Sequence, residues 1–267
     1  MRAYQSLIAL AFALCASCIG PHGEQQPLRA LFVGNSLTYV GNLPAVFSVL
    51  SSANGHAVTS DMIVRGGATL SQRVADGSVE RAFAEQKYAL LVLQERGGDL
   101  ICSFGPSSCV ESQQAIQTLS SLGRKNGAAV VLLGTYQTNP IVSGQLVEKE
   151  SAAAKAAGIP YVEMSEALQT LRRSAPALEW FYHDGNHPGN ALVLLDAVLL
   201  YKQLFGAYPS ATGFAVNAPI YTNESGLTET LRAADAPPPR PETPPAISYA
   251  TDTIQKVIAG LRKQEGS

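Results

Sequence analysis

Two short segments near opposite ends of the chain carry residues that could act together as a serine nucleophile and its base. Ser36 follows an apolar run, residues 31–33, in the block Gly-Asn-Ser-Leu-Thr, so we expect it at a sharp turn between a strand and a helix. Asp184 and His187 are three residues apart across Gly-Asn, a strong turn dipeptide, so their side chains can meet. A serine hydroxyl is too weakly acidic to attack a carbonyl unaided. A histidine oriented by a carboxylate supplies the missing base.

Each segment taken alone has a simpler interpretation. Ser36 lies among common turn residues, and Asp184 or His187 could merely cap the helix expected from Pro188. A metal site at His183, Asp184 and His187 would need further ligands and would leave Ser36 without a role. The turn after the first strand has neither G-x-G-x-x-G nor a Walker lysine, which argues against nucleotide binding there. The pairing of the two segments therefore favours nucleophilic catalysis that needs no metal and no organic cofactor.

The elements that must position these residues alternate between short apolar strands and amphipathic helices. The strand candidates are 29–34, 57–64, 89–94, 128–135 and 159–163. The helix candidates are 43–53, 70–86, 111–125, 145–157, 165–174, 188–205 and 249–263. Short apolar strands separated by helices are typical of a parallel sheet covered on both faces. We therefore predict an α/β fold, a three-layer α/β/α sandwich with a central five-stranded parallel sheet.

In these two blocks the chain resembles the SGNH hydrolase superfamily, also called GDSL-type esterases and lipases. The likeness covers about residues 28–206 and rests on GNSLT at 34–38 and DGNHP at 184–188. It implies the flavodoxin-like SGNH fold. It also implies that Ser36 is the nucleophile, His187 the base and Asp184 the carboxylate that orients the base. Asn35 replaces the usual aspartate of the first block, and a small polar residue can still brace the turn.

The resemblance also implies an oxyanion hole. The family's glycine block is matched by Arg-Gly-Gly-Ala-Thr-Leu at residues 65–70. Gly67 would offer its backbone N–H beside that of Ser36, and a glycine lets the backbone approach the substrate closely.

The chain departs from the family pattern after the third strand. In place of Gly-x-Asn-Asp it has Leu-Gln-Glu-Arg-Gly-Gly-Asp at residues 93–99, where the Gln94 amide could act as the third donor. Glu95 and Arg96 could line the pocket or pair with each other. Since loss of one such donor costs about 100- to 1000-fold in rate, a second hypothesis follows. In it the chain is a catalytically weak or inactive SGNH-fold binding protein of the cell envelope.

The first 18 residues predict an export signal. Arg2 precedes an apolar stretch, residues 7–14, and small residues follow it. A bilayer span takes about 20 residues, so this stretch is too short to be one. Cys18 after Ala-Ser resembles a bacterial lipoprotein cleavage box, although Cys15 stands where leucine is usual. We therefore expect a periplasmic, envelope-attached or secreted protein, with a possible lipid anchor at Cys18.

The remaining cysteines agree with export. Cys102 and Cys109 lie in a Gly/Pro/Ser-rich loop with six residues between them, and in an oxidising compartment they are expected to form a disulfide. Without export they would be two free loop thiols. Residues 19–27 are interpreted as a polar tether and 28–267 as a single domain, with a proline-rich segment at 236–245 before the last helix.

Composition limits the partners. The 46% apolar and 15% charged residues indicate an ordinary globular protein. A pI near 6.1 gives no electrostatic reason to expect nucleic acid or anionic lipid as a partner. We expect a small-molecule or carbohydrate-linked ester of a short acyl group as substrate, while the oligomeric state has no signature in the sequence.

Overall fold

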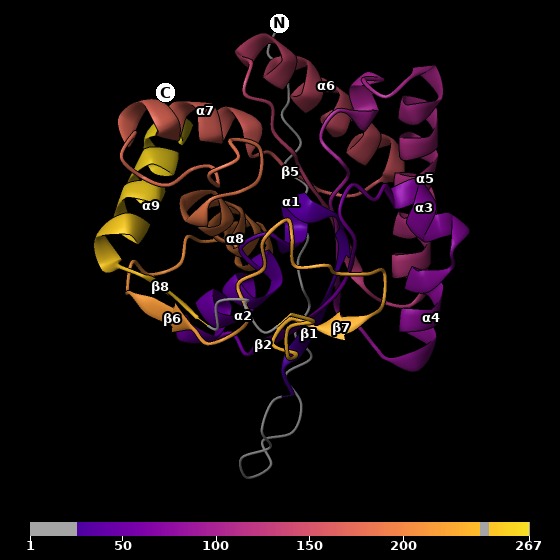
Figure 1. Ribbon diagram of the computed structural model, residues 1–267, viewed down its shortest axis with the longest axis horizontal. Helices are drawn as coiled ribbons and strands as arrows, with labels where there is room; N and C mark the ends of the chain where they lie inside the picture. The colour runs from indigo at the N-terminus through magenta and orange to yellow at the C-terminus, as the bar shows by residue number, and fades with distance from the viewer. Residues whose placement is uncertain (1–25, 241–245, 267) are drawn as a thin grey trace, which may run out of the picture.

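A twisted sheet lies at the centre of the molecule (Figure 1). The computed structural model describes residues 26–240 and 246–266. The strand order in the sheet is β5-β4-β3-β1-β2-β7. The strands are β1 Leu28–Gly34, β2 Val58–Val64, β3 Leu90–Leu93, β4 Ala129–Leu133, β5 Tyr161–Val162 and β7 Arg232–Ala233. Strands β1 to β5 are parallel, as predicted, whereas β7 pairs antiparallel with β2 and was not predicted.

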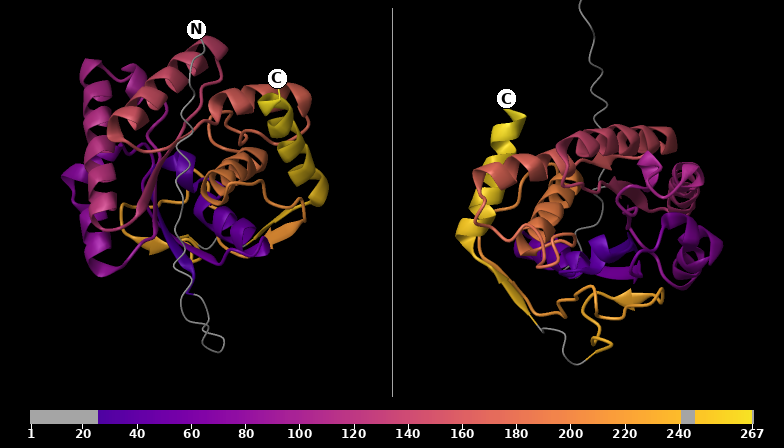
Figure 2. Two further views of the ribbon diagram at one scale, coloured as in Figure 1. Left: turned by 180° about the vertical axis from the view of Figure 1, so that it is seen from behind. Right: turned by 45° about the horizontal axis from the view of Figure 1, so that its top comes forward.

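Helices cover both faces of this sheet. They are α1 Ser36–Tyr39, α2 Leu43–Ala53, α3 Leu70–Ala75, α4 Ser78–Glu85, α5 Pro106–Lys125, α6 Pro140–Ala157, α7 Ser165–Ser174, α8 Asn190–Phe205 and α9 Thr251–Glu265. The 3-10 turn η1, Asp99–Ile101, precedes α5, and a separate two-stranded sheet pairs β6, Phe214–Val216, with β8, Ile247–Tyr249. Figures 1 and 2 show α2, α8 and α9 on one side of the sheet and α3 to α5 on the other. The predicted three-layer α/β/α sandwich is confirmed.

The two faces of the sheet explain the apolar runs in the sequence. Side chains alternate along a strand, so Phe32 of β1 packs toward α2 and α8, while Leu31 and Val33 pack toward the layer of α3 to α6. Because both faces are covered, consecutive positions rather than every second one are apolar, as at residues 31–33 of β1 and at all four residues of β3. None of the helices within the described ranges is long and apolar enough to cross a membrane.

Four helix predictions need correction. The predicted helix 70–86 is two helices, because the chain turns at Gly77 with φ +64° and Ser78 N–H donates to Asp76 Oδ1 at 2.8 Å. The helix predicted from Pro188 begins at Asn190 instead, since Pro188 forms a β-bridge with Phe181.

Helices α5 and α6 start five residues earlier than predicted, each at a proline that suits the first turn. The predicted leader, Cys18 and most of the tether lie outside the described residues.

The order β2-β1-β3-β4-β5 is that of a flavodoxin-like sheet. Its strand order reverses between β1 and β3, and ligands of such sheets bind at the carboxyl ends of the strands near this point. The chain leaves β1 at Gly34, where a Cβ atom would lie 2.1 Å from Thr38 Oγ1 and 3.1 Å from the Gln94 carbonyl oxygen. Glycine therefore allows the chain to turn directly from β1 into α1.

We expect Gly34→Ala to destabilise the protein by about 1–3 kcal/mol, because overpacking of this kind forces backbone shifts. Gly144→Ala is the control. Gly144 lies within α6 with nothing inside 4 Å of its Cβ position, so this change should raise stability by up to about 1 kcal/mol. Urea unfolding of the two variants measures the difference. Equal stabilities would contradict the close contact at Gly34.

Candidate active site

The nucleophile candidate sits at the first position of α1. Asn35 caps this helix, because its Oδ1 accepts a hydrogen bond from Leu37 N–H at 3.0 Å. Asn35 is buried, whereas Ser36 is half-buried at the carboxyl edge of the sheet. The asparagine thus braces the turn, as predicted, and leaves the Ser36 hydroxyl at the surface of that edge.

The buried side chain of Gln94 braces α1 through a hydrogen bond to Thr38. Its Oε1 accepts a hydrogen bond from Thr38 Oγ1 at 2.7 Å, and its Nε2 donates to the Gly134 carbonyl oxygen at 3.2 Å. The Gln94 side chain is 1% exposed. One amide N–H of the residue expected to be an oxyanion donor is therefore engaged with the end of β4. The second N–H is the only one it could offer to a substrate.

Asp184 and His187 form a close pair. The His187 ring Nδ1 lies 2.6 Å from Asp184 Oδ2, and Asp184 Oδ1 accepts the backbone N–H groups of Asn186 at 2.9 Å and His187 at 3.0 Å. Partial burial acts to raise the pKa of the Asp184 carboxyl, but these N–H groups and the histidine ring outweigh it and lower the pKa to about 2. The carboxylate is therefore ionised at neutral pH and can stabilise an imidazolium.

Several contacts bring this pair to the edge where α1 begins. The Tyr136 hydroxyl, after β4, donates to the Asn186 carbonyl oxygen at 2.6 Å. Gly41 N–H, just after α1, donates to the Tyr221 carbonyl oxygen at 2.9 Å, and Asn223 reaches Asp184 two residues further on. The turn 184–187 and α1 are thus linked through both β4 and the C-terminal part of the chain.

His183 does not join the pair. Its ring packs against Tyr182 with the ring centroids 3.9 Å apart, and the residue is exposed. Among the residues that the structure describes, no group of three or more His, Cys, Asp or Glu side chains could hold a metal ion.

The glycine block forms an exposed loop between β2 and α3. Gly67 has φ +67°, in the left-handed region that glycine adopts most easily. Thr69 caps α3 by accepting from Gln72 N–H at 3.3 Å. Gly66 approaches α1, since a Cβ atom there would lie 3.2 Å from the Tyr39 hydroxyl. The loop therefore borders the helix that carries Ser36.

The buried side chain of Glu95 fixes the end of this loop through a hydrogen bond, a role that the sequence analysis missed. The buried carboxylate accepts Leu70 N–H at 3.1 Å, Arg96 N–H at 2.9 Å and the Ser112 hydroxyl at 2.7 Å. Burial raises the pKa of the Glu95 carboxyl to about 7, although the Arg96 N–H and the Ser112 hydroxyl act in the opposite direction. Three elements that are far apart in sequence meet at this one side chain.

Arg96 does not pair with the Glu95 side chain. Its guanidinium binds Asp99 through two hydrogen bonds of 2.9 Å and lies over the Phe104 ring, 3.5 Å from the centroid. Both Glu95 and Arg96 line a hollow of about 250 Å³ beside α3 and α5. The side-chain pairing of Glu95 with Arg96 is therefore wrong, and the hollow that both residues line does not include Ser36, Asp184 or His187.

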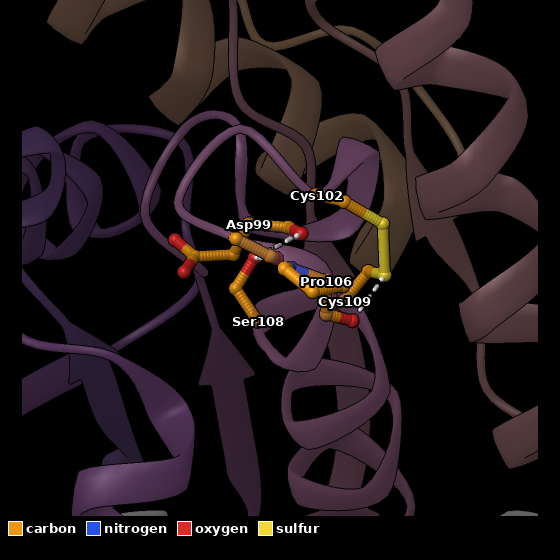
Figure 3. Close-up of a disulfide and its surroundings, with 6 residues drawn as sticks. Asp99, Cys102, Pro106, Ser108 and Cys109 are labelled. Carbon is orange, nitrogen blue, oxygen red and sulfur yellow. Dashed lines mark hydrogen bonds between the residues drawn. A yellow bond between two sulfur atoms is a disulfide. The ribbon is translucent and has the colours of Figure 1, made fainter.

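The predicted disulfide between Cys102 and Cys109 is present (Figure 3). It joins the loop after η1 to the first turn of α5, where the Ser108 hydroxyl donates to the Asp99 carbonyl oxygen at 3.3 Å. The loop that carries Phe104 is therefore closed covalently next to the hollow lined by Arg96.

The fold is that of SGNH hydrolases. A protein of Slackia heliotrinireducens assigned to the SGNH hydrolases superposes with a TM-score of 0.54 and 23% identity, over 67% of this chain and 100% of that one. Axe2, an acetylxylan esterase from Geobacillus stearothermophilus, gives 0.53 and 15% over 66% and 93%. A DUF4886 family protein from Bacteroides uniformis gives 0.53 and 16% over 68% and 84%. No protein-family model and no curated protein sequence matches the chain.

We expect Glu95→Gln to gain stability relative to the wild-type protein as the pH rises. The pKa of Glu95 is about 7 in the folded state, above the ordinary value of 4.5. The free energy of unfolding of the wild-type protein therefore falls as the pH rises from 4.5 to about 7. Glutamine does not titrate, and it keeps an oxygen for the backbone N–H groups of Leu70 and Arg96.

Urea unfolding at pH 5 and pH 8 measures this effect. Glu148→Gln, at an exposed position on α6, is the control and should show the same difference from wild type at both pH values. An unchanged difference for Glu95→Gln would show that this carboxyl titrates normally.

Proposed function

We propose that the protein is a serine esterase in which Ser36 is the nucleophile, His187 the base and Asp184 its orienting carboxylate. The observation that carries the proposal is the 2.6 Å contact between His187 Nδ1 and Asp184 Oδ2, at the same edge of an SGNH-type sheet as the half-buried Ser36 at the start of α1. A variant of the fold neighbour Axe2 described as a catalytic mutant replaces a serine with alanine.

The chemistry follows from which ring nitrogen is free. With Nδ1 held by Asp184, Nε2 of His187 is left to take the proton of the Ser36 hydroxyl as its oxygen attacks an ester carbonyl. The tetrahedral intermediate then expels the alcohol, which receives the proton from His187. Water activated by His187 hydrolyses the acyl-serine and regenerates the free hydroxyl. No step needs a metal or an organic cofactor.

The proposed oxyanion donors are the backbone N–H groups of Ser36 and Gly67, with the second amide N–H of Gln94 as the third. The left-handed backbone of Gly67, next to Gly66 whose Cβ position lies 3.2 Å from the Tyr39 hydroxyl of α1, supports the first pair. The buried hydrogen bonds of Gln94 make bracing of α1 its larger contribution.

The proposed substrates are small or carbohydrate-linked esters of short acyl groups. Axe2, which shares the fold, is an acetylxylan esterase. The proposed setting is outside the cytoplasm, with residues 1–18 as export signal and Cys18 as a possible lipid anchor. The disulfide between Cys102 and Cys109 supports an oxidising compartment.

Ser36→Ala is expected to lower the hydrolysis of p-nitrophenyl acetate by at least about 1000-fold, because the reaction loses its covalent route. The matched control is Ser71→Ala, an exchange of the same kind in α3. Release of p-nitrophenol by the purified proteins measures the rates. Equal slow release by wild type and Ser36→Ala would reject the esterase.

His187→Gln should lower kcat by about 100- to 10,000-fold, the usual contribution of a general base. His183→Gln should stay near the wild-type rate, since His183 is exposed and its ring packs against Tyr182. Measurement of kcat for both variants separates the two histidines. A larger loss of kcat in His183→Gln than in His187→Gln would show that His187 is not the base.

The alternative function is an SGNH-fold binding protein with little or no turnover. It is favoured by one observation, the engagement of the Gln94 amide with Gly134 in place of a free asparagine donor. Under this alternative, wild type and Ser36→Ala bind an acetylated sugar equally well and neither hydrolyses it.

A further inference from the structure

An arm formed by residues 219–234 lies beside the candidate active site. In Figure 1 it is the orange segment that passes α1 on its way to β7. The likeness to SGNH hydrolases in sequence ends near residue 206, before the arm begins. The Slackia heliotrinireducens protein is covered completely by 67% of this chain, so a third of this chain has no counterpart in it.

A single buried asparagine clasps both ends of the arm. Asn42 Nδ2 donates to the carbonyl oxygen of Pro219 at 2.7 Å and to that of Ala234 at 2.8 Å. Its Oδ1 accepts Ala45 N–H at 3.3 Å at the start of α2, and the residue is fully buried. Asn42 follows α1 by three residues, so the arm is fixed to the same turn of chain that carries the nucleophile candidate.

Further contacts inside the arm make it a defined part of the fold. Tyr221 is buried and bridges Val40, while Arg232 pairs with Met62 in the sheet. Leu227 is also buried, at 5% exposure. The arm therefore has its own anchors and does not depend on the candidate site for its position.

The tip of the arm, residues 222–230, contacts both the turn that carries Asp184 and the first residue of the glycine block. At one end Asn223 Nδ2 donates to Asp184 Oδ2 at 3.4 Å, the same oxygen that faces the His187 ring. At the other end Glu229 Oε2 lies 3.5 Å from Arg65, the first residue of the glycine block. The tip thus runs from the Asp184–His187 pair to the loop that carries the proposed oxyanion donor.

We propose that the arm completes the active site. Asn223 is a positioning residue for the Asp184–His187 pair, and the tip forms the wall that contacts the alcohol part of the ester. The exposed side chains of the tip are amide, carboxylate and hydroxyl groups, contributed by Asn223, Glu224, Thr228, Glu229 and Thr230. Such groups can bind the hydroxyls of a sugar, whereas an aliphatic chain would desolvate them without compensation. The arm therefore selects hydroxyl-bearing alcohols. This inference rests on the proposed esterase function.

The positioning role is tested with two substitutions at one residue. Asn223→Ala should lower kcat for p-nitrophenyl acetate about fivefold with little change in KM, because the pair loses one donor. Asn223→Asp should lower kcat further, since a second carboxylate would face Asp184, and high salt should restore part of that extra loss.

Asn217→Ala and Asn217→Asp are the matched controls. Asn217 is exposed and lies just before the arm, so both variants should keep the wild-type kcat. Equal effects of Ala and Asp at position 223, with no response to salt, would overturn the positioning role.

The specificity role is tested by weakening the two hydrogen bonds from Asn42 to the ends of the arm. Asn42→Asp keeps an oxygen for Ala45 N–H and a residue type that tolerates the left-handed backbone of φ +57°, but it places a carboxylate against the two carbonyl oxygens of the arm. We expect kcat/KM for a monoacetylated methyl xylopyranoside, which keeps two free hydroxyls, to fall about tenfold more than kcat/KM for p-nitrophenyl acetate. Titration of active serine corrects both rates for any unfolded protein.

Equal losses on the two substrates would overturn the specificity role. Failure of the esterase function has a different signature, since wild type and Ser36→Ala would then hydrolyse p-nitrophenyl acetate equally slowly. The ratio of kcat/KM values for the two substrates is interpreted only after that comparison. Failure of the specificity role and failure of the esterase function therefore remain distinguishable.

Discussion

The two hydrogen bonds of Gln94 are the interaction on which the candidate site depends. One buried amide accepts from Thr38 in α1 and donates to Gly134 at the end of β4, so it links the ends of β1 and β4 through β3. This link holds Thr38 Oγ1 in the space that a side chain at Gly34 would occupy. The chain must therefore turn immediately after β1, and that turn presents Ser36 at the carboxyl edge of the sheet.

Buried acceptors also organise the neighbouring strand ends. Loops that leave a parallel sheet carry backbone N–H groups without strand partners, and these must be satisfied when buried. Glu95 accepts Leu70 N–H at the end of the glycine loop, and Glu150 accepts both Thr135 N–H and the Thr135 hydroxyl, at 3.0 and 2.5 Å. Burial raises the pKa of Glu150 to about 8, as it raises the pKa of Glu95 to about 7. The edge is thus held by directional hydrogen bonds, which fix loop geometry more closely than apolar packing would.

The parts that could be predicted from sequence are those that depend on local pattern. Apolar runs predicted five parallel strands because both faces of the sheet are covered, and the pairing of Asp184 with His187 follows from a turn only four residues long. The role of Glu95 depends on contacts with α3 and α5, which lie far away along the chain. Strand β7 has two residues and no apolar periodicity, so only its pairing with β2 identifies it. Local sequence patterns could therefore reveal neither the role of Glu95 nor strand β7.

Some parts of the site belong to the fold that this chain shares with its structural neighbours, and others belong to the arm. This difference bears on which substrate the site would accept. A fold alone does not determine what an enzyme acts on, and the Slackia heliotrinireducens protein and Axe2 are 23% and 15% identical to the chain. The α/β unit supplies a serine at a strand end and an Asp–His turn, which could serve any acyl ester. Asp184 Oδ2, however, receives donors from two sources, His187 within that unit and Asn223 in the arm. Asn42 holds both ends of the arm at the turn after α1, so the arm is tied to the segment that carries Ser36 as well as to Asp184. The arm is therefore the part of this chain in which its specificity should be sought.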